Sequence, residues 1–266
     1  MRRFATLLAV LGCLTSGAAV AAATPAGTAV GVNPSATDVV ANTSRTLVVG
    51  SDVAVGDRIV TGPTGQVQLI FHDDTHLVVG PSSSLVVESY LLRGGSQSVG
   101  KFAVSALGGT FRFITGQSDH SAYTISTPTG TIGVRGTAFD FTVAGLHKPA
   151  KPTDFLPGTT VALFKGQVQL CNLAGKCVIL TSRCDAGFAD TSKTERVGPF
   201  QAIDLGLRAR FRYIQSERPL LEPFRIRESR LCFINNNQNP GGLSLPSSSP
   251  GSAPPSKPPP GRGTRG

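Results

Sequence analysis

The residues with the most definite chemistry are four cysteines that follow residue 23: Cys171, Cys177, Cys184 and Cys232. An even number of cysteines in an exported chain favours disulfides, and we predict two of them. Cys171 and Cys177 bracket a predicted hairpin tip, so we pair them, and we pair Cys184 with Cys232. The alternative is a four-thiolate zinc site, but the spacings lack the close Cys-x2-4-Cys pairs that such sites use.

A second group of ligand-type residues is His72, Asp73, Asp74 and His76. Imidazole and carboxylate groups bind several metal cations, so a metal site is one interpretation. Histidines four residues apart share a face only on a helix, whereas this segment is flanked by predicted strands. We therefore predict a solvated hairpin turn and no metal site.

Residues in patterns typical of catalysis are scarce. The sequence contains no Gly-x-Ser-x-Gly motif, and neither His120 nor His147 lies beside an obvious nucleophile. The glycines at 130, 133 and 136 lack the Lys-Ser/Thr ending of a phosphate-binding loop. We predict no catalytic residues and no cofactor, although a hydrolase with dispersed catalytic residues remains an alternative.

Arginines are concentrated near the C-terminus. The cluster consists of Arg208, Arg210, Arg212, Arg218, Arg225, Arg227 and Arg230. One interpretation is a solvated face that Glu217, Glu222 and Glu228 partly neutralise. The other is contact with an acidic protein or an anionic envelope polymer, for which we select Arg208, Arg210 and Arg212.

The elements that must position these residues are predicted to be strands. The chain has 31 glycines and 19 prolines, and only 15% of its residues are charged, which is typical of many short strands joined by turns. Around Thr127–Phe141, apolar residues recur at every second position. The alternation slips between Val134 and Phe139, which predicts a turn or bulge at Arg135–Thr137.

Similar alternation recurs every eight to twelve residues and predicts an all-β domain. The predicted strand segments lie within 53–62, 66–71, 77–79, 85–87, 101–104, 110–114, 122–126, 159–164, 166–171 and 177–180. This periodicity does not distinguish a solenoid from a sandwich or a barrel.

The N-terminal segment 1–23 has the pattern of a secretory signal peptide, with Arg2 and Arg3 before an apolar stretch and a small-x-small cleavage site. Lipidation at Cys13 is the less favoured alternative. No later segment reaches the ~20 apolar residues that a membrane-spanning helix needs. We expect a periplasmic or secreted protein that does not span a membrane, with a lead-in at 24–46.

The composition changes after residue 187. Residues 200–214 fit either a short helix or a strand, and we expect 188–234 to form an extension packed on the β domain. Residues 235–266 are rich in Asn, Pro, Gly and Ser and are expected to be disordered. Basic residues exceed acidic ones by only ten to nine between 22 and 182, so we predict no nucleic-acid binding.

Several segments in this order resemble a FecR domain. They include 55–62, 67–71, 75–79, 108–113, 127–139 and 161–168, and the signature residues are Gly56, Asp57, Thr61, Thr127, Pro128, Gly136, Thr137 and Phe139. The resemblance implies a twisted β-solenoid of short strands, and we place the FecR-like domain at 47–187. FecR regulators carry a cytoplasmic anti-sigma region and a membrane helix ahead of this domain, and we expect neither here.

The resemblance and the residues together predict a non-enzymatic, exported FecR-type module. Its expected role is protein binding or sensing at the bacterial cell envelope, with a partner that the sequence does not identify. The alternative is a structural scaffold protein of the envelope.

Overall fold

A computed structural model describes residues 24–40, 43–92, 99–118, 122–144, 157–199 and 212–232. The predicted signal peptide and the predicted disordered tail lie outside these ranges, as does most of the segment 200–214. None of the helices in the described part of the chain is long and apolar enough to cross a membrane.

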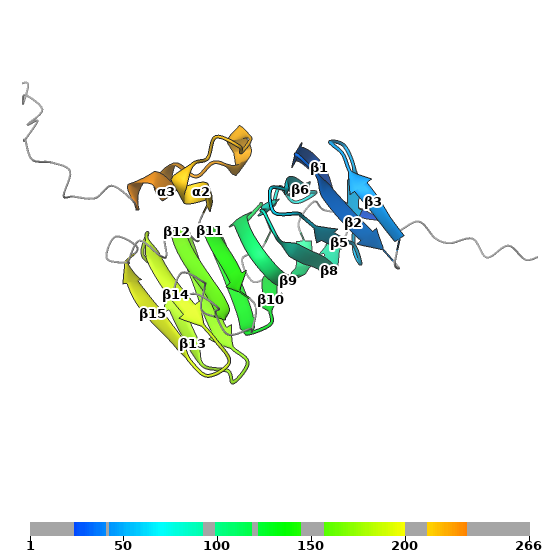
Figure 1. Cartoon of the computed structure of the whole chain (residues 1–266). Coiled ribbons are helices and arrows are strands. Elements are labelled where there is room, and N and C mark those ends of the chain that lie inside the picture. The colour runs from blue at the N-terminus through cyan, green and yellow to red at the C-terminus, as the bar shows by residue number, and fades with distance from the viewer. Residues whose placement is uncertain are drawn as a thin grey trace, which may run out of the picture. The chain divides into compact units, whose positions relative to one another are not determined.

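Within these ranges, fifteen strands join into one hydrogen-bonded sheet (Figure 1). The strands are β1 (Pro25–Asn33), β2 (Ala36–Val40), β3 (Thr43–Leu47), β4 (Asp52–Ala54), β5 (Arg58–Val60), β6 (Gln66–Phe71), β7 (His76–Val79), β8 (Ser84–Leu92), β9 (Val99–Ile114), β10 (Tyr123–Thr127), β11 (Gly130–Ala144), β12 (Gly158–Asn172), β13 (Cys177–Leu180), β14 (Asp185–Ala189) and β15 (Thr194–Pro199). The prediction of an all-β fold is confirmed. The strands form an open sheet, and their pairing does not confirm the predicted solenoid.

The main path through the sheet runs β15-β14-β12-β11-β10-β9-β7-β6-β1-β4, and β2, β3, β5, β8 and β13 pair at its sides. The described pairings are antiparallel except for the parallel pair of β9 and β10. The predicted strands 101–104 and 110–114 are two parts of β9. This strand stays continuous because β8 and β10 pair with its first part and β7 and β11 pair with its second part.

Alternate side chains of the long strands form the main hydrophobic core. Phe111 and Phe113 of β9 and Phe139 and Phe141 of β11 are fully buried in it. The rings of Phe111 and Phe141 stack with their centroids 4.8 Å apart. Burial of one such ring contributes roughly 1.5–3 kcal/mol, so this aromatic cluster fixes the register of β9 against β11.

The predicted interruption at Arg135–Thr137 is confirmed as a register shift in the pairing of β11 with β12. Gly136 and Gly166 both have positive φ angles, of 60° and 83°. A Cβ atom on Gly166 would overlap the carbonyl oxygen of Gly136. Glycine is therefore required here both for the backbone conformation and for the close approach of the two strands.

The sheet begins earlier than the sequence predicts. The segment 24–46 was expected to be a lead-in, but it contains β1, β2 and most of β3. β1 consists mainly of small residues, and a Cβ on its Gly27 would lie only 2.6 Å from the carbonyl oxygen of Ile70 on β6. Close backbone packing, rather than alternation of large apolar side chains, therefore places this strand in the sheet.

Candidate partner-binding surface

Residues 212–232, called the strap below, lie across the face of the sheet opposite the main core (Figure 1). The strap contains α2 (Arg212–Gln215), η2 (Glu222–Phe224) and α3 (Arg227–Leu231). Its first part packs on β6 and β7 through a cluster of Tyr213, Leu220 and Phe224. Its last part packs on β12 and β14 through Ile226 and Cys232.

Arg112 of β9 is the centre of the contact between sheet and strap, and it is fully buried. Its Nε and Nη2 atoms donate to the two carboxylate oxygens of Asp140 on β11, at 2.7 and 3.0 Å. Its Nη1 atom donates to Glu217 Oε1 and, at 3.2 Å, to the carbonyl oxygen of Phe224. One guanidinium group thus joins two strands to the strap.

Glu217 carries this contact further into the strap. Its Oε1 atom also accepts a hydrogen bond from the Ile226 backbone N–H at 2.8 Å and one from Ser229 Oγ at 3.2 Å. The Arg112 guanidinium lies over the rings of Phe164 and Tyr213, at 5.8 and 5.5 Å from their centroids. These contacts close the strap around a buried charge.

Burial by itself would lower the pKa of Arg112, but Asp140 and Glu217 outweigh it and hold that pKa above its ordinary value. The guanidinium therefore stays charged at every working pH. A buried charge stabilises a fold only when its hydrogen-bonding groups are well matched, and the paired donation to Asp140 provides that match.

The disulfide between Cys184 and Cys232 attaches the end of the strap to the segment before β14, with 5.3 Å between the Cα atoms. This bond has the predicted pairing. It closes a loop of 48 residues, and constraining such a loop in the unfolded chain is worth roughly 4 kcal/mol. The strap is thus held at its centre by Arg112 and at its end by a covalent bond.

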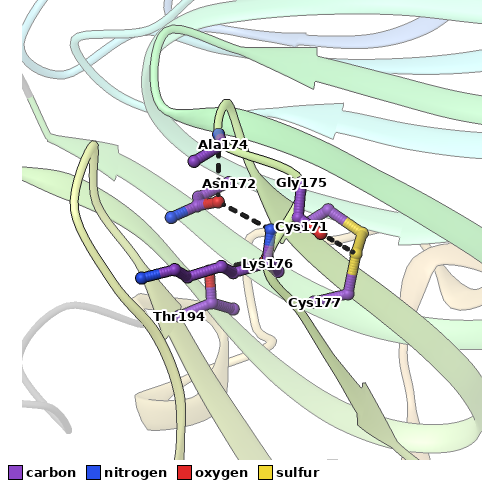
Figure 2. The surroundings of a disulfide bond; sticks show 7 residues. All are labelled: Cys171, Asn172, Ala174, Gly175, Lys176, Cys177 and Thr194. Atoms are coloured by element: carbon purple, nitrogen blue, oxygen red, sulfur yellow. Dashed lines mark hydrogen bonds between the residues drawn. A yellow bond between two sulfur atoms is a disulfide. The ribbon is translucent and has the colours of Figure 1, made fainter.

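The second predicted disulfide, Cys171–Cys177, joins the two strands of the β12–β13 hairpin beside its turn (Figure 2). Inside this hairpin, Asn172 Oδ1 accepts hydrogen bonds from the backbone N–H groups of Ala174 and Lys176, at 3.1 and 3.0 Å. Thr194 of β15 donates through Oγ1 to the Lys176 carbonyl oxygen at 2.9 Å. The disulfide therefore stiffens a hairpin that β15 also contacts.

Exposed arginines lie on the strap. Arg212, Arg218 and Arg227 are exposed, whereas Arg225 is bound to Glu222 at 2.9 Å. Two residues of the predicted contact, Arg208 and Arg210, lie outside the described residues.

The expectation that Glu217 helps to neutralise this face is wrong, because its carboxylate is buried against Arg112. The strap therefore presents a basic surface that is less compensated than the sequence indicates.

The turn at His72–Thr75 is present, but the prediction that it is solvated is wrong for Asp73, which is only 2% exposed. Asp73 Oδ2 accepts hydrogen bonds from Tyr123 Oη at 2.7 Å, and from Thr75 Oγ1 and Ser118 Oγ at 2.9 Å each. A carboxylate with this many donors connects the turn to β10 and to the segment after β9. These hydrogen bonds hold the turn against the neighbouring segments.

The two histidines of this segment point to different surroundings. His76 of β7 contacts the ring of Phe224 edge-on, with 5.0 Å between centroids, and burial lowers its pKa. His72 is exposed and lies near Tyr90. Among the described residues, no three His, Cys, Asp or Glu side chains are grouped as metal ligands. His120 and His147 lie outside the described residues.

Residues 57–169 match the protein-family model described as FecR protein. This part of the chain is a FecR domain. No curated protein matches the chain. Two crystal structures of a putative anti-sigma factor from Parabacteroides distasonis ATCC 8503 are similar, at 13% identity and a TM-score of 0.39. The match covers 53% of this chain and 57% of that protein, so the chain spans little more than half of its length.

The first signature residues of the FecR domain shape the turns around β5. Gly56 has a φ of 95°, in the left-handed region that favours glycine. Asp57 Oδ2 accepts a hydrogen bond from the Ala54 backbone N–H at 2.9 Å. Thr61 Oγ1 donates to the Gly80 carbonyl oxygen at 2.5 Å. These residues hold backbone segments together.

The later signature residues lie in the turn before β11 and in the middle of that strand. Thr127 Oγ1 accepts a hydrogen bond from Thr159 Oγ1 at 2.8 Å, beside the turn that contains the exposed Pro128. The Thr137 backbone N–H donates to Thr115 Oγ1 at 2.9 Å, and Phe139 lies in the core. The structure therefore does not gather the FecR signature residues into one site.

The Arg112 network is the part of the surface that sequence reasoning missed. A signal was present, because Arg112 lies between two phenylalanines and Asp140 does too. The two Phe-charge-Phe triplets pair in register across β9 and β11. Opposite charges flanked by core residues on both sides indicate a buried ion pair between neighbouring strands. No comparable signal points to Glu217.

Proposed function

We propose that this protein is a non-enzymatic, exported FecR-type module that binds a protein partner at the bacterial cell envelope, as part of sensing or regulation. The FecR domain supports a regulatory or sensing role. Two disulfides support an oxidising location such as the periplasm or the extracellular space. The FecR sheet serves as the scaffold, and the strap is the binding surface.

The observation that carries this proposal is the way the strap is held. Arg212, Arg218 and Arg227 are exposed on a segment that a buried arginine and a disulfide fix to the FecR sheet. A basic surface held in one conformation loses little conformational entropy on binding. It suits a partner with an acidic surface, or an anionic polymer of the envelope, and such contacts raise the rate of encounter.

The test is a pull-down from envelope extract with the tagged, oxidised full chain. The test variant carries Arg212→Gln, Arg218→Gln and Arg227→Gln. The matched control, with the same loss of charge, carries Lys101→Gln, Lys176→Gln and Lys193→Gln, which are exposed positions outside the strap.

We expect one protein to be retained in a fixed ratio by the wild type and the control and to be lost from the strap variant. Retention should weaken as ionic strength approaches about 1 M, where the screening length falls to about 3 Å. Equal retention by all three proteins, or binding unchanged by salt, would contradict the assignment of the strap. Recovery of a polyanion rather than a protein would identify the polymer alternative.

A structural scaffold of the envelope is the second candidate function. The covalent attachment of both the β12–β13 hairpin and the strap favours it, because stiffness is what a scaffold requires. In the same pull-down, a scaffold without a specific partner gives no protein in a fixed ratio. It would instead co-fractionate with the envelope irrespective of the three strap arginines.

A further inference from the structure

A second pair of buried carboxyl groups lies at the other end of the described chain, next to the start of the FecR domain. Asp38 of β2 is fully buried and lies opposite Arg45 in the pairing of β2 with β3. Its Oδ2 atom accepts a hydrogen bond from Arg45 Nε at 2.7 Å. Its Oδ1 atom is buried and has no hydrogen-bond donor. A buried carboxylate oxygen without a donor is costly, so this atom requires an explanation.

Asp57 is the other member of the pair, in the turn between β4 and β5, and is 5% exposed. Its Oδ2 atom accepts from the Ala54 N–H and lies 3.5 Å from Arg45 Nη2. That Nη2 atom also donates to the Asp52 carbonyl oxygen at 2.6 Å. One guanidinium therefore serves both carboxyl groups and a backbone carbonyl, and its side chain is 49% exposed.

Few other charges face this pair. Asp52 of β4 and Glu88 of β8 are exposed, and the exposed Arg58 of β5 donates to Ser84 Oγ at 3.0 Å. β1, which pairs with β4, contains no charged residue. Among the described residues, Arg45 is therefore the cation that contacts the pair.

Both carboxyl groups contact the Arg45 guanidinium, at 2.7 Å for Asp38 Oδ2 and 3.5 Å for Asp57 Oδ2, so they lie side by side. A hydrogen bond between them would give Asp38 Oδ1 the partner that it lacks. Two charged carboxylates cannot form that bond because neither has a hydrogen to donate. We propose that Asp38 and Asp57 form a proton-binding site in which one shared proton bridges the two carboxyl groups, with the orphaned Asp38 Oδ1 as one of its oxygens. Acid therefore tightens the attachment of the β2–β3 hairpin to the FecR domain.

The direction of the Asp57 pKa shift is the one expected for a carboxyl group that retains a proton. Burial raises the pKa of Asp57 above its ordinary 3.8, and Asp38 raises it further against the opposing effects of the Ala54 N–H and Arg45. A carboxyl group whose pKa is raised in the folded state stabilises that state most fully at pH values below its pKa in the unfolded chain. That contribution is lost as the pH rises through the raised value. The hairpin is thus held more tightly in acid than at neutral pH.

The test is an NMR titration of the oxidised full chain labelled with ¹³C at the aspartate carboxyl carbons. We expect the Asp57 carboxyl carbon to titrate above the ordinary aspartate range, with a midpoint that depends on its neighbour Asp38. Asp38→Asn should shift the Asp57 midpoint downward, because it removes the competing charge and supplies an amide donor. Asp52→Asn, a nearby exposed control, should leave the Asp57 midpoint in place.

An Asp57 midpoint that Asp38→Asn does not move would overturn the proposal. So would a wild-type Asp57 midpoint at or below the ordinary range, since Arg45 would then be keeping that group charged. The wild-type titration decides this even if a variant fails to fold.

Hydrogen exchange of the β2 and β3 amides, corrected for intrinsic rates, gives a structural readout of the same site. We expect protection of these amides to fall several-fold in the wild type as the pH rises through the raised pKa of Asp57. Asp57→Asn, which cannot lose a proton, should flatten this dependence. Amides of β12 serve as an internal reference, and an equal fall there would contradict a local effect at the hairpin.

Discussion

Two regions of this molecule use the same three groups, one arginine and two carboxyl groups, in different surroundings. Arg112 is fully buried and donates in pairs to Asp140 and singly to Glu217. Arg45 is half exposed and divides its donors between Asp38 and a backbone carbonyl. Only the second region leaves a buried carboxylate oxygen without a donor.

The difference shows that composition does not decide what an arginine and two acids do. Full burial with matched donors makes the Arg112 network a fixed clamp. Partial exposure with too few donors makes the Arg45 region sensitive to protons. The strap is therefore held by a guanidinium that stays charged, whereas the attachment of the β2–β3 hairpin varies with pH.

The largest effect is expected from Arg112→Met, which leaves the buried carboxylates of Asp140 and Glu217 without the cation that they share. Removing one member of a buried ion pair costs about 3–5 kcal/mol of unfolding free energy, as measured by denaturant unfolding. Arg112→Lys keeps the charge but loses the paired geometry, so it should cost less. A loss below about 1 kcal/mol for Arg112→Met would show that this region resembles the Arg45 region after all.

A smaller effect is expected when Cys184 and Cys232 are both replaced by serine. The loss of a closed loop should lower the unfolding free energy by about 2–4 kcal/mol. Because Arg112 still holds Glu217, the strap should remain attached, and limited proteolysis should cut it only slowly. Rapid proteolysis of the strap in this variant would show that the disulfide, and not Arg112, is its main attachment.

The smallest effect is expected from Arg45→Gln, because the guanidinium is half exposed and solvent screens its charge. The unfolding free energy at neutral pH should fall by about 1 kcal/mol or less. Since this variant removes the cation facing Asp38 and Asp57, the stability it retains should depend more steeply on pH than in the wild type. A loss as large as that of Arg112→Met would end the distinction between the two regions.

The strands and their interruptions could be predicted because they depend on local patterns. Alternation around Phe139 and Phe141 marks β11, and the slip at Arg135–Thr137 marks its bulge. The disulfide pairing also followed from local reasoning for Cys171 and Cys177. β1 could not be predicted in this way, because its small residues show no alternation of large apolar side chains.

By itself, the amino-acid sequence determined the all-β fold, the FecR domain and the set of cysteines that pair. Alternation, glycine at the turns and cysteine number act over short distances, so they are visible without a structure. Only the tertiary structure decided that Glu217 lies against Arg112 and that Asp38 lies beside Asp57. Both contacts join segments from different parts of the chain. The burial that determines the strength of their charge interactions exists only once the sheet is folded.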